Sequence, residues 1–295
     1  MNNDARSMLG AVGVWSTELR HAERKGVADA VAELAELGLR ALWIPGLDGS
    51  GAFEDVRALL LAAPRTTVAL GVLGIWGQAP EMVGDRLHAL DAEFGPRTVV
   101  GLGVSNAHAA ASVGQAYGNP VDSVASYLTR LDNAAHPVPA GRRLLGALGP
   151  KMADLAASRT AGLHPFLVTP AYSEAMRARL GPGPVIAPHQ AAVFESDPVR
   201  ARAVARAGIG MFIGLPAYQA NLQRMGFTEA DIVPGGSNRL IDAVVAWGSP
   251  GRIRARIRAH LDAGADHVAV HVLTGGDSLP QRQWRELADL VPALT

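Results

Sequence analysis

Short apolar runs alternate with amphipathic stretches along this chain, and that alternation predicts the fold class. Eight apolar runs have the length and composition of buried strands, namely 11–15, 41–44, 66–76, 98–106, 144–148, 163–169, 185–194 and 267–273. Segments with apolar residues at helical spacing, such as VADAVAELAELG and EMVGDRLHALDAEFG, lie between them. Strands that alternate with helices indicate a parallel sheet, and eight such units in about 300 residues fit a TIM (β/α)8 barrel. An open doubly wound sheet is the main alternative.

The longest connection, from about 196 to 265, separates the seventh run from the eighth. Its pattern predicts a helical insertion at about 196–248, between strands 7 and 8, within a single domain spanning 1–295. The stretch SPGRIRARIRAHLDAG then reads as a helix with Ser249 at its N-cap and Pro250 at its first position. Long insertions in such barrels often cover the active face.

Composition and charge exclude several classes of function. The chain has 27 Lys and Arg against 27 Asp and Glu, so it has no net positive field for nucleic acid. It has no cysteine, which excludes disulfides and thiol catalysis. No apolar run is long enough to span a membrane, and the first residues lack the features of a signal peptide. We therefore expect a cytoplasmic protein.

A Gly-Pro-Lys sequence follows the fifth run, where the predicted strand ends and a helix begins. Gly149 allows a ligand to approach the backbone closely, and Pro150 suits the first position of a helix. The free N–H groups of such a helix start favour an anion, and Lys151 adds a full positive charge. From spacing alone, a phosphate site and an ordinary helix start with a solvated lysine are equally consistent.

The remaining motifs are weaker. GLGVSN at 101–106 begins like a dinucleotide fingerprint but lacks its third glycine, so we favour small residues packed inside a barrel. Ser105 and Asn106 would nevertheless lie at the carboxyl end of the fourth strand, where barrel sites occur. His267 and His271 are roughly 13 Å apart along a strand, too far to share a metal, and no metal site is predicted.

Histidines and tryptophans near strand ends are the candidate pocket residues. His189, His271, Trp15 and Trp76 occupy such positions, and for each a packing role is an equal alternative. A histidine there could donate a proton to a developing alkoxide or enolate. Other histidines read as surface or helix residues, namely His21, His88, His136 and His260.

Three segments together resemble the luciferase-like monooxygenase superfamily, and within it the branch of oxidoreductases that depend on the deazaflavin coenzyme F420. They are TTVALGVLGIWGQAPEMVGDRLHALDAEFGPRTVVGLGVSN, GALGPKMADLAASRTAGLHPFLVTP and AWGSPGRIRARIRAHLDAGADHVAVHV. The resemblance implies a TIM barrel, usually dimeric, that binds F420 or FMN at its mouth and acts on a small-molecule substrate.

The resemblance also implies site residues. The cofactor phosphate would lie at the loop after the fifth strand, formed by Leu148, Gly149, Pro150, Lys151 and Met152. A non-proline cis peptide behind the cofactor ring would fall near Gly74, Ile75 and Trp76, and Ser105 and Asn106 would contact cofactor or substrate.

One departure limits the resemblance. Sugar-phosphate dehydrogenases of this branch carry a glutamate where this chain has Asn106, so that activity is not expected. Asp48 is a loosely aligned candidate for the acidic residue near the ring. The alternatives to F420-dependent hydride transfer are an FMN-dependent monooxygenase and a non-catalytic flavin-binding barrel.

Overall fold

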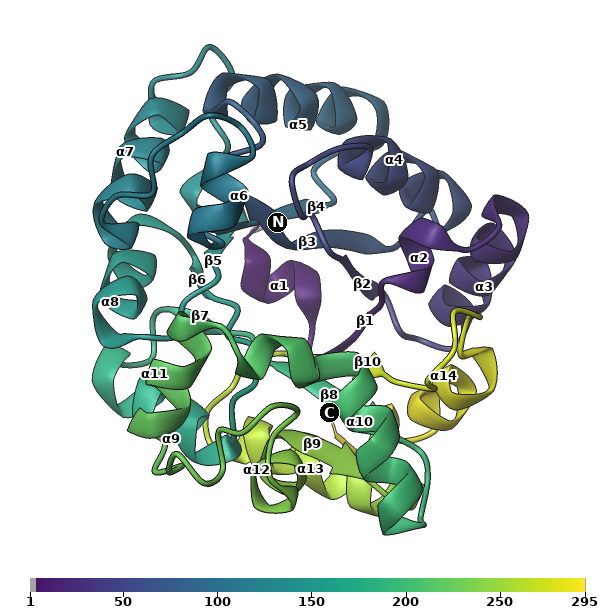
Figure 1. The fold of residues 1–295 in the computed structure, drawn as a ribbon. Coiled ribbons are helices and arrows are strands. Elements are labelled where there is room, and N and C mark those ends of the chain that lie inside the picture. The colour runs from purple at the N-terminus through teal and green to yellow at the C-terminus, as the bar shows by residue number, and fades with distance from the viewer. Residues whose placement is uncertain (1–3, 295) are drawn as a thin grey trace.

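The computed structural model describes residues 4–294, which surround a parallel sheet that curls round on itself (Figure 1). The strand order is β7-β6-β5-β4-β3-β2-β1-β10-β8-β9. The strands are β1 (Val12–Trp15), β2 (Ala41–Ile44), β3 (Thr67–Gly74), β4 (Thr98–Gly103), β5 (Arg143–Leu145), β6 (Gly162–Leu163), β7 (Val185–Ile186), β8 (His189–Val193), β9 (Val245–Trp247) and β10 (Val268–Val272). The parallel sheet predicted from the apolar runs is confirmed.

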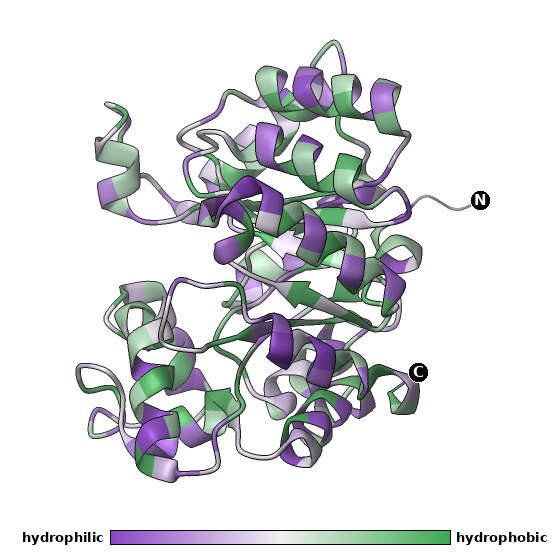
Figure 2. Cartoon of the chain, turned by 90° about the vertical axis from the view of Figure 1, so that its right-hand side faces the viewer, coloured by the Kyte–Doolittle hydropathy of each residue, from purple (hydrophilic) through white to green (hydrophobic). Residues whose placement is uncertain are grey.

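Helices pack around the outside of this sheet (Figure 1). They are α2 (Glu18–His21), α3 (Arg24–Glu36), α4 (Ala52–Ala62), α5 (Pro80–Phe94), α6 (Ala107–Ala111), α7 (Pro120–Asp132), α8 (Pro150–Arg159), α9 (Pro170–Leu180), α10 (Pro198–Ile213), α11 (Pro216–Arg224), α12 (Asn238–Val244), α13 (Pro250–Asp262) and α14 (Gln281–Ala288). Hydrophilic and hydrophobic residues alternate along these helices, and the strands between them are largely hydrophobic (Figure 2). The apolar faces of the helices and the outward faces of the strands form one core.

The run predicted as a single seventh strand is two short strands, β7 and β8. Pro188 lies between them and has no backbone N–H to donate toward β10. His189 N donates to Pro165 O at 2.9 Å, and Ala269 N donates to Pro188 O at 2.9 Å. The segment 188–189 is therefore hydrogen-bonded to Pro165 beyond β6 on one side and to β10 on the other. These bonds on both sides curl the sheet.

The stretch predicted as a helical insertion contains α10, α11 and α12, but its last residues belong to the sheet. Strand β9 pairs in parallel with β8, with Ala191 opposite Val245 and Val193 opposite Trp247. The sequence analysis did not predict this strand. Ser249 and Pro250 occupy the N-cap and first positions of α13 as expected, although the Ser249 side chain forms no capping hydrogen bond.

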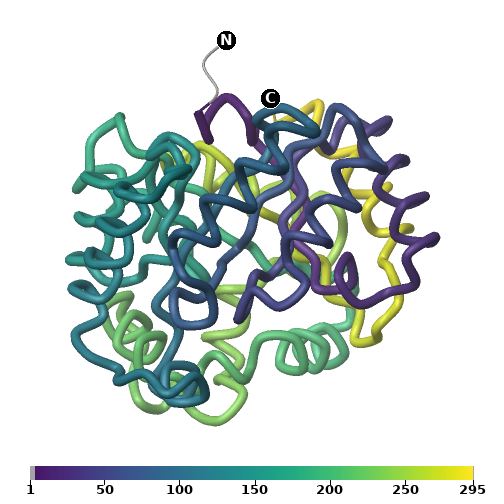
Figure 3. Tube along the Cα trace, turned by 90° about the horizontal axis from the view of Figure 1, so that it is seen from above, coloured from purple at the N-terminus to yellow at the C-terminus, as the bar shows by residue number. Residues whose placement is uncertain are grey.

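A short helix, α1 (Ala5–Leu9), lies in the middle of the ring of strands (Figure 1), on the side opposite α10 and α11 (Figure 3). Its buried residues Ala5 and Leu9 belong to the same cluster as Ala41 and Val99, which line the inside of the sheet. Helix α1 therefore covers the amino ends of the strands and leaves the carboxyl ends for a site.

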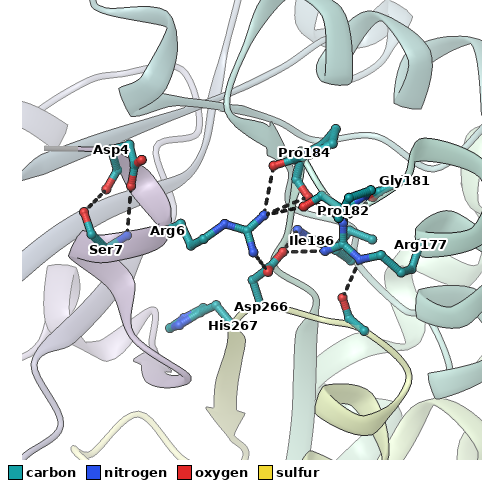
Figure 4. Close-up of polar contacts among 12 residues, drawn as sticks. Asp4, Arg6, Ser7, Arg177, Gly181, Pro182, Pro184, Ile186, Asp266 and His267 are labelled. Carbon is teal, nitrogen blue, oxygen red and sulfur yellow. Dashed lines mark hydrogen bonds and ion pairs between the residues drawn. The ribbon is translucent and has the colours of Figure 1, made fainter. Parts of the chain in front are cut away.

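An arginine and aspartate cluster holds α1 in place (Figure 4). Arg6 is paired with Asp266, which lies two residues before the start of β10, and donates to Gly183 O at 2.9 Å. Arg177 Nη2 donates to the other oxygen of Asp266 at 2.6 Å, and Ile186 N donates to it at 2.8 Å. One mostly buried carboxylate thus joins α1, α9 and β7.

Replacing that carboxylate should destabilise the protein. Asp266→Asn removes the charge between two guanidinium groups, and we expect a loss of about 2 kcal/mol of unfolding free energy in urea. Glu81→Gln is the matched control, because Glu81 pairs with Arg130 where both side chains are about half exposed, and it should cost less than about 0.5 kcal/mol. Equal effects of the two substitutions would contradict a specific role for Asp266.

Candidate functional site

Large aromatic and imidazole side chains fill the inside of the curled sheet, from His267 just before β10 to Trp15 at the end of β1. Because side chains alternate across a strand, Trp15 and His271 at the ends of β1 and β10 lie side by side. The full group, called the aromatic chamber below, is Trp15, Trp43, His164, Phe166, His189, His267 and His271. The chamber therefore draws on five different parts of the sheet.

Trp15 is held in one orientation within the chamber. Its indole N–H donates to Gly71 O at 3.2 Å, and the side chain is buried. Its ring centroid lies 4.4 Å from that of His271 and 5.1 Å from that of His189. The two histidines and the tryptophan chosen from the sequence are thus in mutual contact.

A non-proline cis peptide occurs in β3, but at Gly71–Val72 and not at the predicted Gly74-Ile75-Trp76. The β3–β4 register shifts between Leu70 and Leu73 at the same place. Gly74 and Ile75 instead have ordinary backbone partners, because Gly74 N donates to Leu47 O and Ile75 N donates to Gly103 O. The predicted position was therefore wrong, although the strand was right.

Gly71 lies against the chamber. A Cβ atom placed on it would lie 2.9 Å from His164 Nε2, Trp15 Nε1 and Trp43 Cε3. No larger residue fits without moving these rings, so the absence of a side chain at Gly71 is part of how the chamber packs.

His189 and His271 form a pair. His189 Nε2 and His271 Nδ1 are 3.1 Å apart, and both side chains are buried. Burial lowers the pKa of His271 to about 3 and, together with the neighbouring imidazoles, holds the pKa of His189 well below its usual value. Both rings are therefore neutral at pH 7, and they would act through hydrogen bonds of the neutral imidazole.

The sequence analysis missed four members of the chamber. Trp43 stacks on His164 at 4.3 Å between ring centroids, and Phe166 stacks on His189 at 3.4 Å. Burial lowers the pKa of His164 and of His267 to about 4. His164 and Phe166 belong to a segment that read as a plain apolar run, and only the tertiary packing brings them to His189.

His260 was predicted to be a surface or helix residue, and the first alternative is wrong. It is buried in α13, with Nε2 3.0 Å from Gln190 Oε1 and Nδ1 2.9 Å from Ser173 Oγ. It lies outside the chamber and links two outer helices to β8.

The loop after β5 has the predicted helix start. Gly149 is the N-cap of α8 and Pro150 is its first residue. Tyr172 fixes the loop by donating its hydroxyl to Leu148 O at 3.0 Å. Met152 is buried, whereas Lys151 is exposed and forms no ion pair with any described residue.

A second cation lies at this helix start. The guanidinium of Arg224, from α11, would be 3.4 Å from a Cβ on Gly149, and it donates a hydrogen bond to Asn221 Oδ1 at 3.3 Å. Arg224 is distant in sequence from Gly149, so no local pattern could have indicated it. Two cations beside the free N–H groups of α8 make this end of the helix suited to an anion.

The loop after β4 uses its polar residues locally. Asn106 is the N-cap of α6, and its side chain accepts a hydrogen bond from Ala109 N at 3.0 Å. Ser105 has a φ of 55°, and its carbonyl lies 3.5 Å from the Tyr117 hydroxyl. A contact of either residue with a cofactor stays a prediction.

Two clefts lie outside the chamber. One of about 660 Å³ is bordered by Ile75, Trp76 and a polar face of α7. The other, of about 340 Å³, lies between β9 and α13 and is bordered by Trp247 and Arg252. Neither is bordered by Leu148–Met152. Within residues 4–294, no group of three or more histidines and acids is arranged to hold a metal ion.

Several enzymes of known structure have a fold similar to that of this chain. An F420-dependent secondary alcohol dehydrogenase in complex with an F420-acetone adduct has a TM-score of 0.73, with 97% of this chain and 99% of that chain covered at 13% identity. The coenzyme F420-dependent tetrahydromethanopterin reductase of Methanopyrus kandleri has a TM-score of 0.74, with the same coverage and identity. The chain has the fold of these enzymes.

The same fold occurs in monooxygenases. The oxygenating constituent of 3,6-diketocamphane monooxygenase of Pseudomonas putida, in complex with FMN, has a TM-score of 0.64, with 96% of each chain covered at 14% identity. No protein-family model matches the sequence, and no curated protein matches it either. The resemblance to luciferase-like and F420-dependent enzymes is thus confirmed at the level of the fold.

None of the helices in residues 4–294 is long and apolar enough to cross a membrane.

Proposed function

We propose that the chain is an oxidoreductase in which coenzyme F420 exchanges a hydride with a small organic substrate at the carboxyl ends of the strands. The observation that carries this proposal is that one chain has both the aromatic chamber and a helix start with two cations, in a fold shared with F420-dependent enzymes. We further propose that the curled sheet is an eight-stranded barrel core, that α10–α12 form an insertion, and that residues 1–295 form one domain.

The residues present fit such a cofactor. A deazaflavin and FMN both carry a phosphate, and the start of α8 offers free backbone N–H groups together with Lys151 and Arg224. The packed aromatic chamber would form the floor beneath a planar ring system, and its buried ring nitrogens His164 Nε2 and His189 Nδ1 have no partner among the described residues. The cofactor would supply the carbon that gives or takes the hydride.

The chain itself supplies orientation and a dry site. Trp15 and Phe166 cover the paired histidines and exclude water. A neutral imidazole can polarise a carbonyl oxygen by hydrogen bonding without giving up a proton. His271, at the end of β10, is the residue we assign to that role, with Trp15 and His189 on either side of it.

Loss of either cation at α8 should weaken cofactor binding. For Lys151→Ala and for Arg224→Ala we expect the dissociation constant of the deazaflavin to rise about fivefold each at low salt, which corresponds to about 1 kcal/mol. Fluorescence titration measures this directly. The difference should shrink as salt is raised, because exposed charges are screened.

Lys25→Ala is the matched control, since Lys25 is the chain's other lysine and is exposed in α3. It should leave the affinity unchanged. If both Lys151→Ala and Arg224→Ala bound the deazaflavin as tightly as the parent protein does, the cofactor phosphate would not bind at the start of α8.

The cofactor itself is tested by titrating the deazaflavin and FMN side by side, followed by turnover with the reduced cofactor. We expect the deazaflavin to bind more tightly than FMN, to exchange hydride with the substrate and, in its reduced form, to react only slowly with oxygen. Micromolar binding of FMN without binding of the deazaflavin would replace the assignment with an FMN-dependent monooxygenase. Binding without turnover would favour a non-catalytic flavin-binding protein.

We also propose that the protein forms a homodimer, which analytical ultracentrifugation would test.

A further inference from the structure

The contact between His189 and His271 links a buried ring nitrogen to one that keeps some exposed surface. His189 Nδ1 is buried and has no partner among the described residues. His189 Nε2 is 3.1 Å from His271 Nδ1. His271 Nε2 has no partner within residues 4–294 either, but it keeps a small exposed surface, since it is not among the buried unpartnered atoms.

Both rings are neutral, so each carries one proton on one of its two nitrogens. The position of that proton decides whether His271 Nε2 is a hydrogen-bond donor or an acceptor toward a ligand. In one arrangement His189 Nε2 donates to His271 Nδ1, and the proton of His271 is on Nε2. In the other, His271 Nδ1 donates to His189 Nε2, which leaves His271 Nε2 bare and places a proton on the buried His189 Nδ1.

Two neighbouring histidines show which kind of nitrogen this chamber leaves without a partner. His164 Nδ1 lies 2.6 Å from Ala187 O and must donate to it, so its unpartnered Nε2 is bare. His267 Nδ1 likewise donates to Gly10 O at 2.8 Å, and its bare Nε2 accepts from Trp43 Nε1 at 2.9 Å. At His164 the unpartnered buried atom is therefore an acceptor.

The same choice at His189 is favoured by the geometry, because the residue's own backbone carbonyl, which acts on the ring as an acceptor, forms no hydrogen bond with Nδ1. Buried N–H groups without an acceptor are rarer in folded proteins than buried acceptors without a donor. A bare Nδ1 on His189 requires the proton on Nε2, where it has His271 Nδ1 as its acceptor.

We propose that His189 is a positioning residue that fixes the tautomer of His271, so that His271 presents an N–H at Nε2 to the mouth of the chamber. Neither residue changes its protonation state in this role. The pair acts as one oriented hydrogen-bond donor, with His189 held by the stacked ring of Phe166.

The consequence for the substrate rests on the proposed function. A fixed N–H selects a group with an acceptor oxygen, such as a carbonyl or a carboxylate, and cannot remove a proton from a hydroxyl group. The site would then bind a carbonyl substrate in preference to the corresponding alcohol. A bare Nε2 would select the opposite class, namely ligands that donate a hydrogen bond.

The test is NMR of the cofactor-free protein labelled with 15N in its histidine rings, at pH 7. Two-bond correlations between ring protons and ring nitrogens distinguish the two neutral tautomers, and the spectrum of His271→Gln assigns the His271 signals. We expect His271 and His189 each as a single tautomer with the proton on Nε2. A proton on His271 Nδ1 would overturn the proposal, whatever cofactor the protein binds.

Two variants of His189 separate positioning from packing. His189→Leu removes the donor, and His271 should change from one tautomer to a mixture of both. His189→Gln keeps an N–H donor and should preserve the Nε2–H form of His271. An unchanged His271 tautomer in His189→Leu would contradict a positioning role. If that variant does not fold, the spectrum of the parent protein alone decides.

Discussion

The free energy of unfolding should fall steeply as the pH is lowered from 7 to 5.5. Five histidines are buried and neutral, and burial is the largest cause of the lowered pKa in each. They are His164, His189, His260, His267 and His271. In the unfolded chain these rings take up protons near pH 6.5. In the folded protein the pKa is about 4 for His164 and His267 and about 3 for His260 and His271.

The direction follows from proton binding. A pKa that is lower in the folded state gives stability above the unfolded value, and that stability is lost as the pH falls toward the folded value. Between pH 7 and 5.5 each such histidine lowers the free energy of unfolding by about 1.2 kcal/mol, so the five together lower it by on the order of 6 kcal/mol. That is a large part of the roughly 5–15 kcal/mol typical of a folded protein.

Urea unfolding at pH 7, 6.3 and 5.5 measures this effect. His164→Phe should reduce the pH dependence by about one fifth, because one of five titrating groups is removed. His21→Phe is the matched control, since His21 is exposed in α2 and should leave the dependence as it was. A urea midpoint that does not change between pH 7 and 5.5 would show that these rings are not buried as neutral groups.

The periodicity of the sequence predicted most of the sheet, because burial acts on each strand separately. β2 matches its predicted run at both ends, and β1, β4 and β10 lie within theirs. Lengths were predicted poorly where a proline interrupts backbone pairing. β6 stops at Leu163, just before His164-Pro165, and Pro188 divides the seventh run. Strand β9 follows directly after α12, and nothing in its three residues separates it from a helix end.

The site was predictable only where its chemistry is local. Pro150 at the start of α8 needs nothing beyond its neighbours, so the sequence indicated it correctly. The neutral state of His271 depends on its burial beside Trp15 of β1 and His189 of β8. The approach of Arg224 to Gly149 depends on the course of α11. Such contacts between distant segments leave no periodic pattern in a single sequence.

Trp43 should be the most sensitive side chain of the chamber. It is fully buried, donates its indole N–H to His267 Nε2 at 2.9 Å, and stacks on His164 with 15° between the ring planes. Trp43→Ala leaves a large cavity and an unpartnered nitrogen on His267, and we expect it to lower the free energy of unfolding by about 3–5 kcal/mol. Urea unfolding at pH 7 measures the loss.

Trp43→Phe keeps an aromatic ring against His164 and removes the hydrogen-bond donor together with part of the ring volume. It should cost about 1–3 kcal/mol, less than the alanine variant. Trp76→Ala is the matched control: its indole donates to Val104 O, but the side chain is only partly buried at the edge of the 660 Å³ cleft. Its cost should be well below that of Trp43→Ala. If Trp43→Ala proved no worse than Trp76→Ala, the chamber would not be the packed centre of the molecule, and its histidines would be open to water and able to take up protons.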